Sequence, residues 1–588
     1  MGTRPHAIAP TSHAREFILL LAAAAIARIA LLCLPFDTQF SLLVDDAFYY
    51  LEAARRWVTT GAWPSMDGIH PTNGFHPLYM GLAGLVQWLL GSDPHTVVRV
   101  MLGLNLTFNA LAAWVLARAW AESRNSPNSS LQVPFSALLL LALDPGWIAH
   151  ALAGVENSLS SLLLLVFALR MRGEMERSSQ APPGWSPVRL CIDGLLAGAC
   201  MLARSDSALW VAVGFGFQFV QARATVGVRR AVAELGLRAA SAVAIVAPWL
   251  LANLQQFGAI AQDSALAIRA RTLALDGPVG SAGWLKRSVL DLGFWAYRLA
   301  WAWGFLPLTG ALLGMTLPTD RLRQPAIDRV AVVVLPLLCA STFLLRGNDF
   351  WSITSARGAA IEISLAAAGF LCGLGLARPR PGPASPFTRW IAASTALTVL
   401  LYGAWFGQFQ AWYTTGPTVV GILLLTGPSL IGLARVRPNL ARTLVALTAL
   451  LLVYRTWNYA AHGAFEGRLT DPLGQGAKLR TSLEAIVGEQ DVRFGSFDSG
   501  RLSYVVHPFP VTNLDGVMNH SASIALRGRR LGAYLEDERI AFILSPPARV
   551  AEFQKASPFV VTEDSVLGNA VGQSVLRVAP LAVPGVTR

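Results

Sequence analysis

Charged residues and cysteines are scarce in this sequence. Asp, Glu, Lys and Arg make up 14% of the 588 residues, whereas soluble domains carry about 25%. This scarcity argues against an ordinary soluble protein. The chain has only five cysteines, and none of them forms the C-x-x-C spacing of a metal or redox site. All five lie in or beside apolar runs, so we interpret them as small core residues.

Long apolar runs dominate the sequence instead. Hydrophobic residues make up 54% of the chain, and the runs recur over most of its length, as in helical proteins that cross a membrane many times. The net charge of +12 would suggest nucleic acid as a partner of a soluble protein. Here the arginines lie in short loops between apolar runs. We therefore interpret them as topology signals and predict the lipid bilayer, and no nucleic acid, as a partner.

Arginine-rich loops determine the predicted topology, because such loops stay in the cytoplasm. The run from Leu78 to Leu90 is about 13 residues long, shorter than the ~20 residues that a span needs. We expect it to be a juxtamembrane helix at the outer surface, together with Ala47 to Val58. About thirteen transmembrane helices then keep every basic loop in the cytoplasm, with the N-terminus inside, in the plasma (inner) membrane. The basic loops lie at about 170–189, 223–238, 321–329, 378–389 and 435–442.

The composition changes after Tyr454. Residues 460–588 are mixed and polar, with short alternating runs at 492–497 and 540–544, which predict strands, and with helix-like stretches at 478–487 and 523–534. This pattern is typical of a small α/β domain. We therefore divide the chain into a transmembrane domain, residues 1–459, and a C-terminal extracytoplasmic α/β domain, residues 460–588.

Two adjacent carboxylates, Asp45 and Asp46, follow the first apolar run and lead the candidate functional residues. A carboxylate at the point where a membrane segment emerges can act as a general base toward an acceptor hydroxyl or amine. Positive side chains can hold a departing phosphate, and aromatic residues suit the faces of sugars. The predicted topology places further candidates of these kinds on the same outer side: Asp67, Asn73, His76, Glu156, Arg204, Asp206, Ser264, Arg269, Arg271, Trp412 and Tyr413.

Each candidate also has a purely structural interpretation. Asp45 and Asp46 could cap the helix that begins at Ala47, and Arg204 with Asp206 could be an ion pair that closes a hairpin. Glu156 could cap the span that follows it. Turn formation explains Asp67 and Asn73 equally well, headgroup binding explains Arg269 and Arg271, and the aromatic belt of a membrane protein explains Trp412 and Tyr413. We expect Asp515 to shape its loop.

Five short segments resemble motifs of the C-type (GT-C fold) polytopic glycosyltransferases. This family includes protein O-mannosyltransferases, lipid A aminoarabinose transferases and mycobacterial arabinofuranosyltransferases. The most specific segments are the acidic pair with its surroundings and the His-Pro start of the following helix. The five segments are Val44–Tyr50, Asp67–Tyr79, Gly154–Leu159, Leu202–Asp206 and Asn513–Asn519.

The resemblance implies a reaction and a set of roles. Such enzymes take sugars from polyprenyl phosphate and transfer them to an extracytoplasmic glycan, lipid or protein. It implies that Asp45 is the general base and that Asp46 supports it or binds a divalent cation, Mg²⁺ or Mn²⁺, although several relatives work without a metal. It also implies that His76 lines the donor side. Ser264 matches a serine near the donor phosphate, but the basic residue expected beside it is replaced by Arg269 or Arg271.

Two other classes of function stay open from the sequence. A transporter or lipid flippase would use ionisable groups inside the membrane, for which Arg28, Asp144 and Asp193 are candidates. A scaffold would instead bind cell-wall partners through its outer domain, and the acidic pair would then be dispensable.

Overall fold

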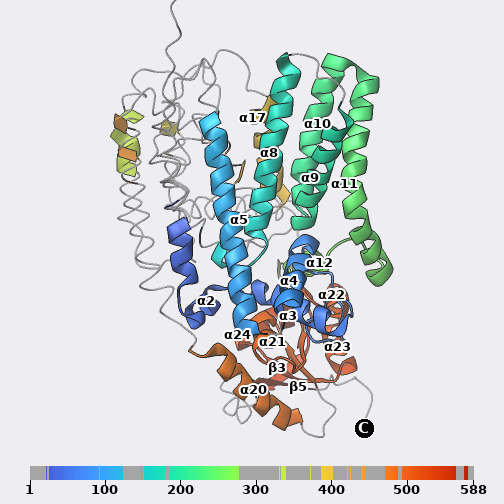
Figure 1. The fold of residues 1–588 in the computed structure, drawn as a ribbon. Coiled ribbons are helices and arrows are strands. Elements are labelled where there is room, and N and C mark those ends of the chain that lie inside the picture. Colours follow the sequence, from blue (N-terminus) through green and yellow to red (C-terminus); the bar gives the residue numbers. More distant parts are fainter. Residues whose placement is uncertain are drawn as a thin grey trace, which may run out of the picture.

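The computed structural model describes most of the N-terminal half and most of the C-terminal domain (Figure 1). Six of the apolar runs that make up the predicted set of about thirteen spans lie wholly or largely outside the described residues; they are the runs at about 133–151, 291–315, 330–345, 359–377, 416–434 and 440–456. Described are residues 25–91, 93–122, 151–180, 186–276, 386–401, 470–487, 493–563 and 575–579, with isolated positions elsewhere.

Long apolar helices pack lengthwise into a bundle (Figure 1). Two of them, α5 over Pro94–Leu116 and the whole of α11, are long and apolar enough to cross a membrane. The pair Ala25–Leu32 and α2 (Phe36–Leu42), bent by 111°, would be a third crossing if it is one broken span. The described chain is thus compatible with a helical membrane protein. The bundle consists of α5 (Pro94–Glu122), α8 (Asn157–Gln180), α9 (Pro187–Ala203), α10 (Ser207–Val226), α11 (Val228–Phe257) and α17 (Pro386–Leu400).

Glycines bring α9 and α11 close together. A Cβ atom on Gly194 would lie 2.2 Å from the carbonyl oxygen of Arg238, and one on Gly198 would lie 2.8 Å from that of Ala242. The two glycines are four residues apart and face the same neighbour, as in the small-xxx-small motifs of membrane helices. Their spacing lets the two backbones touch.

Replacing Gly194 with Ala should therefore destabilise the bundle. The added methyl group meets backbone atoms, and overpacking of this kind costs about 1–3 kcal/mol. Gly236→Ala is the matched control, because nothing lies within 4 Å of its Cβ position on α11 and alanine favours a helix by about 1 kcal/mol. Thermal unfolding in detergent should show a lower midpoint for Gly194→Ala alone. Equal midpoints for the two variants would contradict the close packing.

Two of the residues that motivated the transporter hypothesis have partners inside the bundle. The guanidinium of Arg28 donates to Asn109, and Asp193 accepts from Arg170 and from the Nε of Arg238 at 3.4 Å. The two contacts of Asp193 join α8, α9 and α11 and give this residue a structural role. The third residue, Asp144, lies outside the described residues.

Three helices lie between the bundle and the C-terminal domain (Figure 1). The predicted helices at 47–58 and 78–90 are present and begin slightly earlier than expected. Helix α4 starts at Pro77, which suits the first position because proline has no N–H to leave unsatisfied. The three helices are α3 (Asp45–Thr60), α4 (Pro77–Leu90) and α12 (Asp263–Asp276).

The C-terminal domain is built on a five-stranded sheet of order β2-β1-β3-β5-β4. The first three strands in that order are parallel, and β5 and β4 are antiparallel to their neighbours. The predicted strands at 492–497 and 540–544 are confirmed as β1 and β3. The strands are β1 (Arg493–Ser496), β2 (Val511–Asn513), β3 (Ile540–Leu544), β4 (Val560–Glu563) and β5 (Val575–Ala579).

Among the described residues, five helices accompany this sheet. The stretch predicted at 478–487 lies within α20, but the one predicted at 523–534 is two helices, because the chain turns at Gly528 to Arg530 with a positive φ at Arg529. The helices are α20 (Pro472–Val487), α21 (Gly500–Val505), α22 (His520–Arg527), α23 (Leu531–Asp537) and α24 (Pro547–Ala556).

The carboxyl ends of the parallel strands face the rest of the molecule. In open α/β sheets this edge carries the ligand-binding loops. Here the loop after β1 meets the start of α3, where a Cβ on Gly500 would lie 2.3 Å from the carbonyl oxygen of Asp45. Tyr504 of α21 packs its ring 5.4 Å from that of Phe48. The domain therefore docks on α3 through its loop-bearing edge.

Candidate functional site

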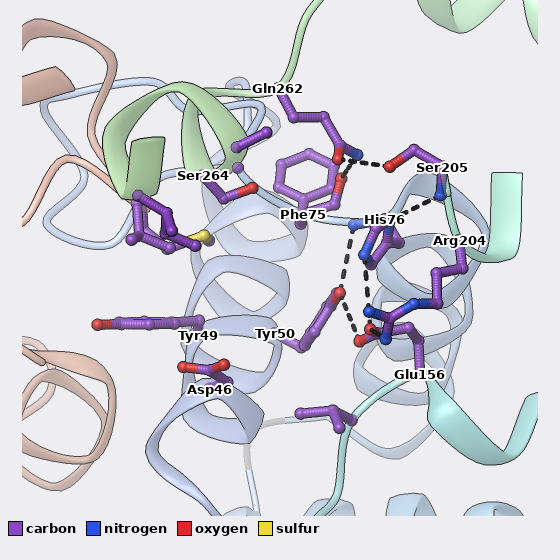
Figure 2. Close-up of a pocket in the computed structure, with 16 residues that line it drawn as sticks. Asp46, Tyr49, Tyr50, Phe75, His76, Glu156, Arg204, Ser205, Gln262 and Ser264 are labelled. Atoms are coloured by element: carbon purple, nitrogen blue, oxygen red, sulfur yellow. Dashed lines mark hydrogen bonds and ion pairs between the residues drawn. The ribbon is translucent and has the colours of Figure 1, made fainter. Parts of the chain in front are cut away.

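A pocket of about 100 Å³ lies where α3, α12, the α9–α10 turn and the C-terminal domain meet. Figure 2 shows Arg204, His76 and Glu156 grouped on one side, with Asp46 and Tyr49 on the other side below Ser264. The lining includes five of the predicted site residues. They are Asp46, His76, Glu156, Arg204 and Ser264.

The two aspartates have different surroundings, although they are adjacent. Both lie in the first turn of α3, where negative charge is favourable. Successive side chains of a helix point about 100° apart, so Asp45 and Asp46 cannot both face the pocket. Asp46 lines the pocket, whereas the carboxylate of Asp45 accepts the backbone N–H groups of Gly500 at 3.0 Å and Arg501 at 2.8 Å.

Asp45 thus ties α3 to the start of α21. Burial is the main cause that raises its pKa to about 6, and the nearby carboxylates Asp498 and Asp515 raise it further, while the two backbone N–H groups oppose the shift. An aspartate in an unfolded chain titrates near 3.9. The folded protein therefore binds this proton more tightly than the unfolded chain does.

This pKa shift predicts a pH dependence of stability. Protonation of Asp45 stabilises the folded state fully below about pH 4, and this contribution is lost as the pH rises through about 6. We expect the thermal midpoint of the wild type to fall between pH 5 and pH 8 by more than that of Asp45→Asn. Because most other groups titrate alike in both proteins, the difference reports chiefly on Asp45. Identical pH profiles would contradict the assignment.

An ion-pair network forms the wall that carries Arg204. Its Nη1 donates to Glu156 and to Asn157, both at 2.9 Å, and its Nε pairs with Asp206 at 3.0 Å. The Arg204 side chain is only 2% exposed. Tyr50 donates to the other oxygen of Glu156 at 3.0 Å. The network joins α3, the start of α8 and the α9–α10 turn, and it fixes the guanidinium at the pocket.

His76 stands at the N-terminus of α4 and faces the same network. Its Nδ1 accepts the backbone N–H of Ser205 at 3.4 Å, which leaves the proton on Nε2, 3.5 Å from Glu156. Burial is the main cause that lowers the pKa of His76, and the charge of Arg204 acts in the same direction. The imidazole is therefore neutral near pH 7 and presents an N–H group toward Glu156.

The start of α12 closes the pocket opposite the acidic helix. The Asn73 side chain accepts the backbone N–H of Asp263 at 2.8 Å and donates to the carbonyl of Ala261 at 3.3 Å. Gln262 donates to the carbonyl of Phe75 at 2.8 Å. Asn73 therefore does not line the pocket but stabilises the turn that presents Ser264 to it.

The other predicted residues are not in the pocket lining. Asp67 accepts from the ring of His70 at 2.6 Å, and this bond and the charge of His70 hold the pKa of Asp67 below its usual value against the effect of burial. Arg271 lies 3.5 Å from Glu552 and over the ring of Phe553, at the C-terminal domain. Arg269 is half-buried on α12. Trp412 and Tyr413 lie outside the described residues.

Several pocket residues were not predicted from the sequence. Tyr49 and Tyr50 lie about one helical turn after Asp46 on α3, and this shared helix face was the available signal. Ser205 lies between two predicted residues. Val517 and Met518 belong to a loop more than 450 residues further along the chain, so local spacing could not associate them with Asp46, and the motif resemblance of Asn513–Asn519 was the available signal.

Binding of a divalent cation by Asp46 stays a prediction. Among the residues described, no group of three or more His, Cys, Asp or Glu side chains converges as a metal site. Glu156 is already engaged by Arg204 and Tyr50.

Comparison with known proteins gives no family assignment. No protein-family model matches the chain, and no curated protein matches it. The function must therefore be inferred from the chemistry of the pocket.

Proposed function

We propose that the protein is a membrane glycosyltransferase that transfers a sugar from polyprenyl phosphate to an extracytoplasmic acceptor. One observation carries the proposal. A carboxylate, Asp46, shares a small pocket with a fixed guanidinium, Arg204, and with apolar side chains such as Ile268. A base, a positive charge and an apolar surface are the parts that an acceptor hydroxyl, a departing phosphate and a lipid-linked donor require.

The proposed chemistry is a single displacement. Asp46 accepts the proton of the acceptor hydroxyl while the acceptor oxygen bonds to the anomeric carbon. The bond between that carbon and the phosphate oxygen breaks, and the electron pair leaves with polyprenyl phosphate. One base and one step predict inversion at the anomeric carbon. The geometry favours Asp46 over Asp45 as this base, and the sequence-based assignment to Asp45 stays a prediction.

The leaving phosphate would meet donors on the far side of the pocket. Arg204 provides positive charge, although Glu156 and Asp206 offset much of it. The hydroxyl of Ser264, in the first turn of α12, lies at the positive end of that helix dipole. Arg269 on the same helix stays a candidate for the phosphate, whereas the contacts of Arg271 with the C-terminal domain favour a docking role.

The proposed topology follows the arginine pattern. About thirteen transmembrane helices would place the N-terminus in the cytoplasm and residues 460–588 outside, with α3 and α4 as juxtamembrane helices of the first outer loop. In support, α4 is a short apolar helix with exposed apolar side chains, among them Trp88 at 69% and Leu89 at 63%. Such a face suits the headgroup boundary of a bilayer.

Purified protein incubated with radiolabelled polyprenyl-phosphate sugars and extracted cell-envelope acceptors would test the proposal. We expect label to move from the lipid to an acceptor, with release of polyprenyl phosphate. Passage of intact lipid-linked sugar across proteoliposomes, with no chemical change, would instead support a flippase and contradict the proposed reaction.

A further inference from the structure

The loop between β2 and α22, residues 514–519, carries the C-terminal domain into the pocket. Val517 and Met518 are the residues that this domain adds to the pocket lining, and both are apolar. The residues contributed by the α9–α10 turn and by the starts of α4 and α8 are mostly polar. The pocket therefore has a polar side, formed by Arg204, His76 and Glu156, and an apolar wall that the C-terminal domain adds.

Side chains of the same loop fix its backbone. Asp515 accepts the N–H of Val517 at 2.8 Å, and Asn513 accepts that of Met518 at 3.3 Å. Asn519 donates to the carbonyl of Asn513 at 3.0 Å. These bonds involve neighbouring residues, so they define the shape of the loop locally.

The N-terminal half holds the loop from the other side. Tyr49 donates to Asp515 at 3.1 Å. A Cβ on Gly74 would lie 1.7 Å from the carbonyl oxygen of Val517, so only glycine permits this approach. The backbone N–H of His520 donates to the carbonyl of Pro71 at 3.4 Å. The position of Val517 and Met518 relative to Asp46 is therefore fixed by contacts on both sides.

We infer that loop 514–519 is the wall that selects the sugar of the donor, with Val517 and Met518 against its less polar face and Asp515 as the positioning residue. This inference rests on the proposed function. A sugar ring presents hydroxyl groups at its edge and C–H groups on its faces, so it fits a pocket with one polar and one apolar wall. Small changes in an apolar wall alter discrimination between similar substrates by about 10- to 200-fold.

Val517→Ala is the direct test, and Val560→Ala is its control, because Val560 is 52% exposed on strand β4. The substrates are undecaprenyl-phosphate-linked arabinose, mannose and glucose. We expect Val517→Ala to raise KM for the preferred donor about tenfold, with kcat within twofold, and to reduce discrimination between pentose and hexose. Unchanged KM and unchanged preference would overturn the inference.

Asp515 variants separate positioning from stability. Asp515→Asn retains an oxygen that can accept the N–H of Val517, whereas Asp515→Ala does not. We expect the alanine variant to raise KM and alter donor preference, and the asparagine variant to restore most of both. A merely structural role would reduce the amount of folded enzyme and leave KM and preference unchanged, which would overturn the positioning role.

Binding measured apart from turnover distinguishes the two proposals. The readout is the shift in thermal midpoint that each of the three lipid-linked sugars produces. If the wild type binds these sugars without transfer, and Val517→Ala alters the binding preference, the inference about loop 514–519 is supported and the transferase proposal fails. If transfer occurs and substitutions of Val517 and Asp515 leave the donor preference unchanged, only the inference about loop 514–519 is refuted. If the wild type neither binds nor transfers, both fail.

Discussion

Asp46→Asn should lower kcat by a factor of roughly 10²–10⁴, the usual contribution of a general base. Asparagine has nearly the shape of aspartate but cannot accept the proton of the acceptor hydroxyl. Because Asp46 lines the pocket rather than the contact with α21, folding and donor binding should be close to those of the wild type. The measurement is kcat of purified protein in detergent, with the thermal midpoint recorded in parallel.

Asp45→Asn is the matched control for this variant. It removes the neighbouring charge by the same substitution, but it acts on the hydrogen bonds to Gly500 and Arg501. We expect it to alter the pH dependence of stability and to leave more activity than Asp46→Asn. An inactive, normally folded Asp45→Asn protein beside an active Asp46→Asn protein would return the base to Asp45, as the family resemblance implies.

Arg204→Met should destabilise the protein by about 3–5 kcal/mol, the effect of breaking a buried ion pair from one side. The substitution leaves Glu156 and Asp206 without the cation that they share, and the side chains of all three are at most 7% exposed. The thermal midpoint in detergent should fall markedly. Adding Glu156→Gln should restore part of the loss, because one of the two stranded charges is then removed.

Arg172→Met provides the comparison for Arg204. Arg172 pairs with Glu176 one turn away at 2.6 Å, and the two side chains are 34% and 56% exposed. Pairs of this kind contribute at most about 1 kcal/mol. A loss for Arg204→Met no larger than for Arg172→Met would mean that the network around Glu156 does not hold the pocket wall.

Much of the architecture could be predicted from the sequence because it follows local patterns. Apolar length predicted a helical membrane protein, alternating runs located β1 and β3, and the apolar run at 78–90 located α4, which begins at Pro77. The full number of spans stays a prediction, since many of the segments concerned lie outside the described residues.

The candidate site was predictable only in part. Residue chemistry and the motif resemblance selected Asp46, His76, Glu156, Arg204 and Ser264, and these come together. The different environments of Asp45 and Asp46 depend on the direction of each side chain and on the docking of α21. Neither is encoded in local spacing.

The most direct test of the central claim is a structure of the protein with a non-hydrolysable undecaprenyl-phosphonate sugar. We predict that the sugar lies between Asp46 and loop 514–519, with its phosphonate beside Ser264 or Arg204 and the acceptor side of the anomeric carbon open toward Asp46. A ligand bound elsewhere, with Asp46 out of reach of any acceptor at that carbon, would contradict the account.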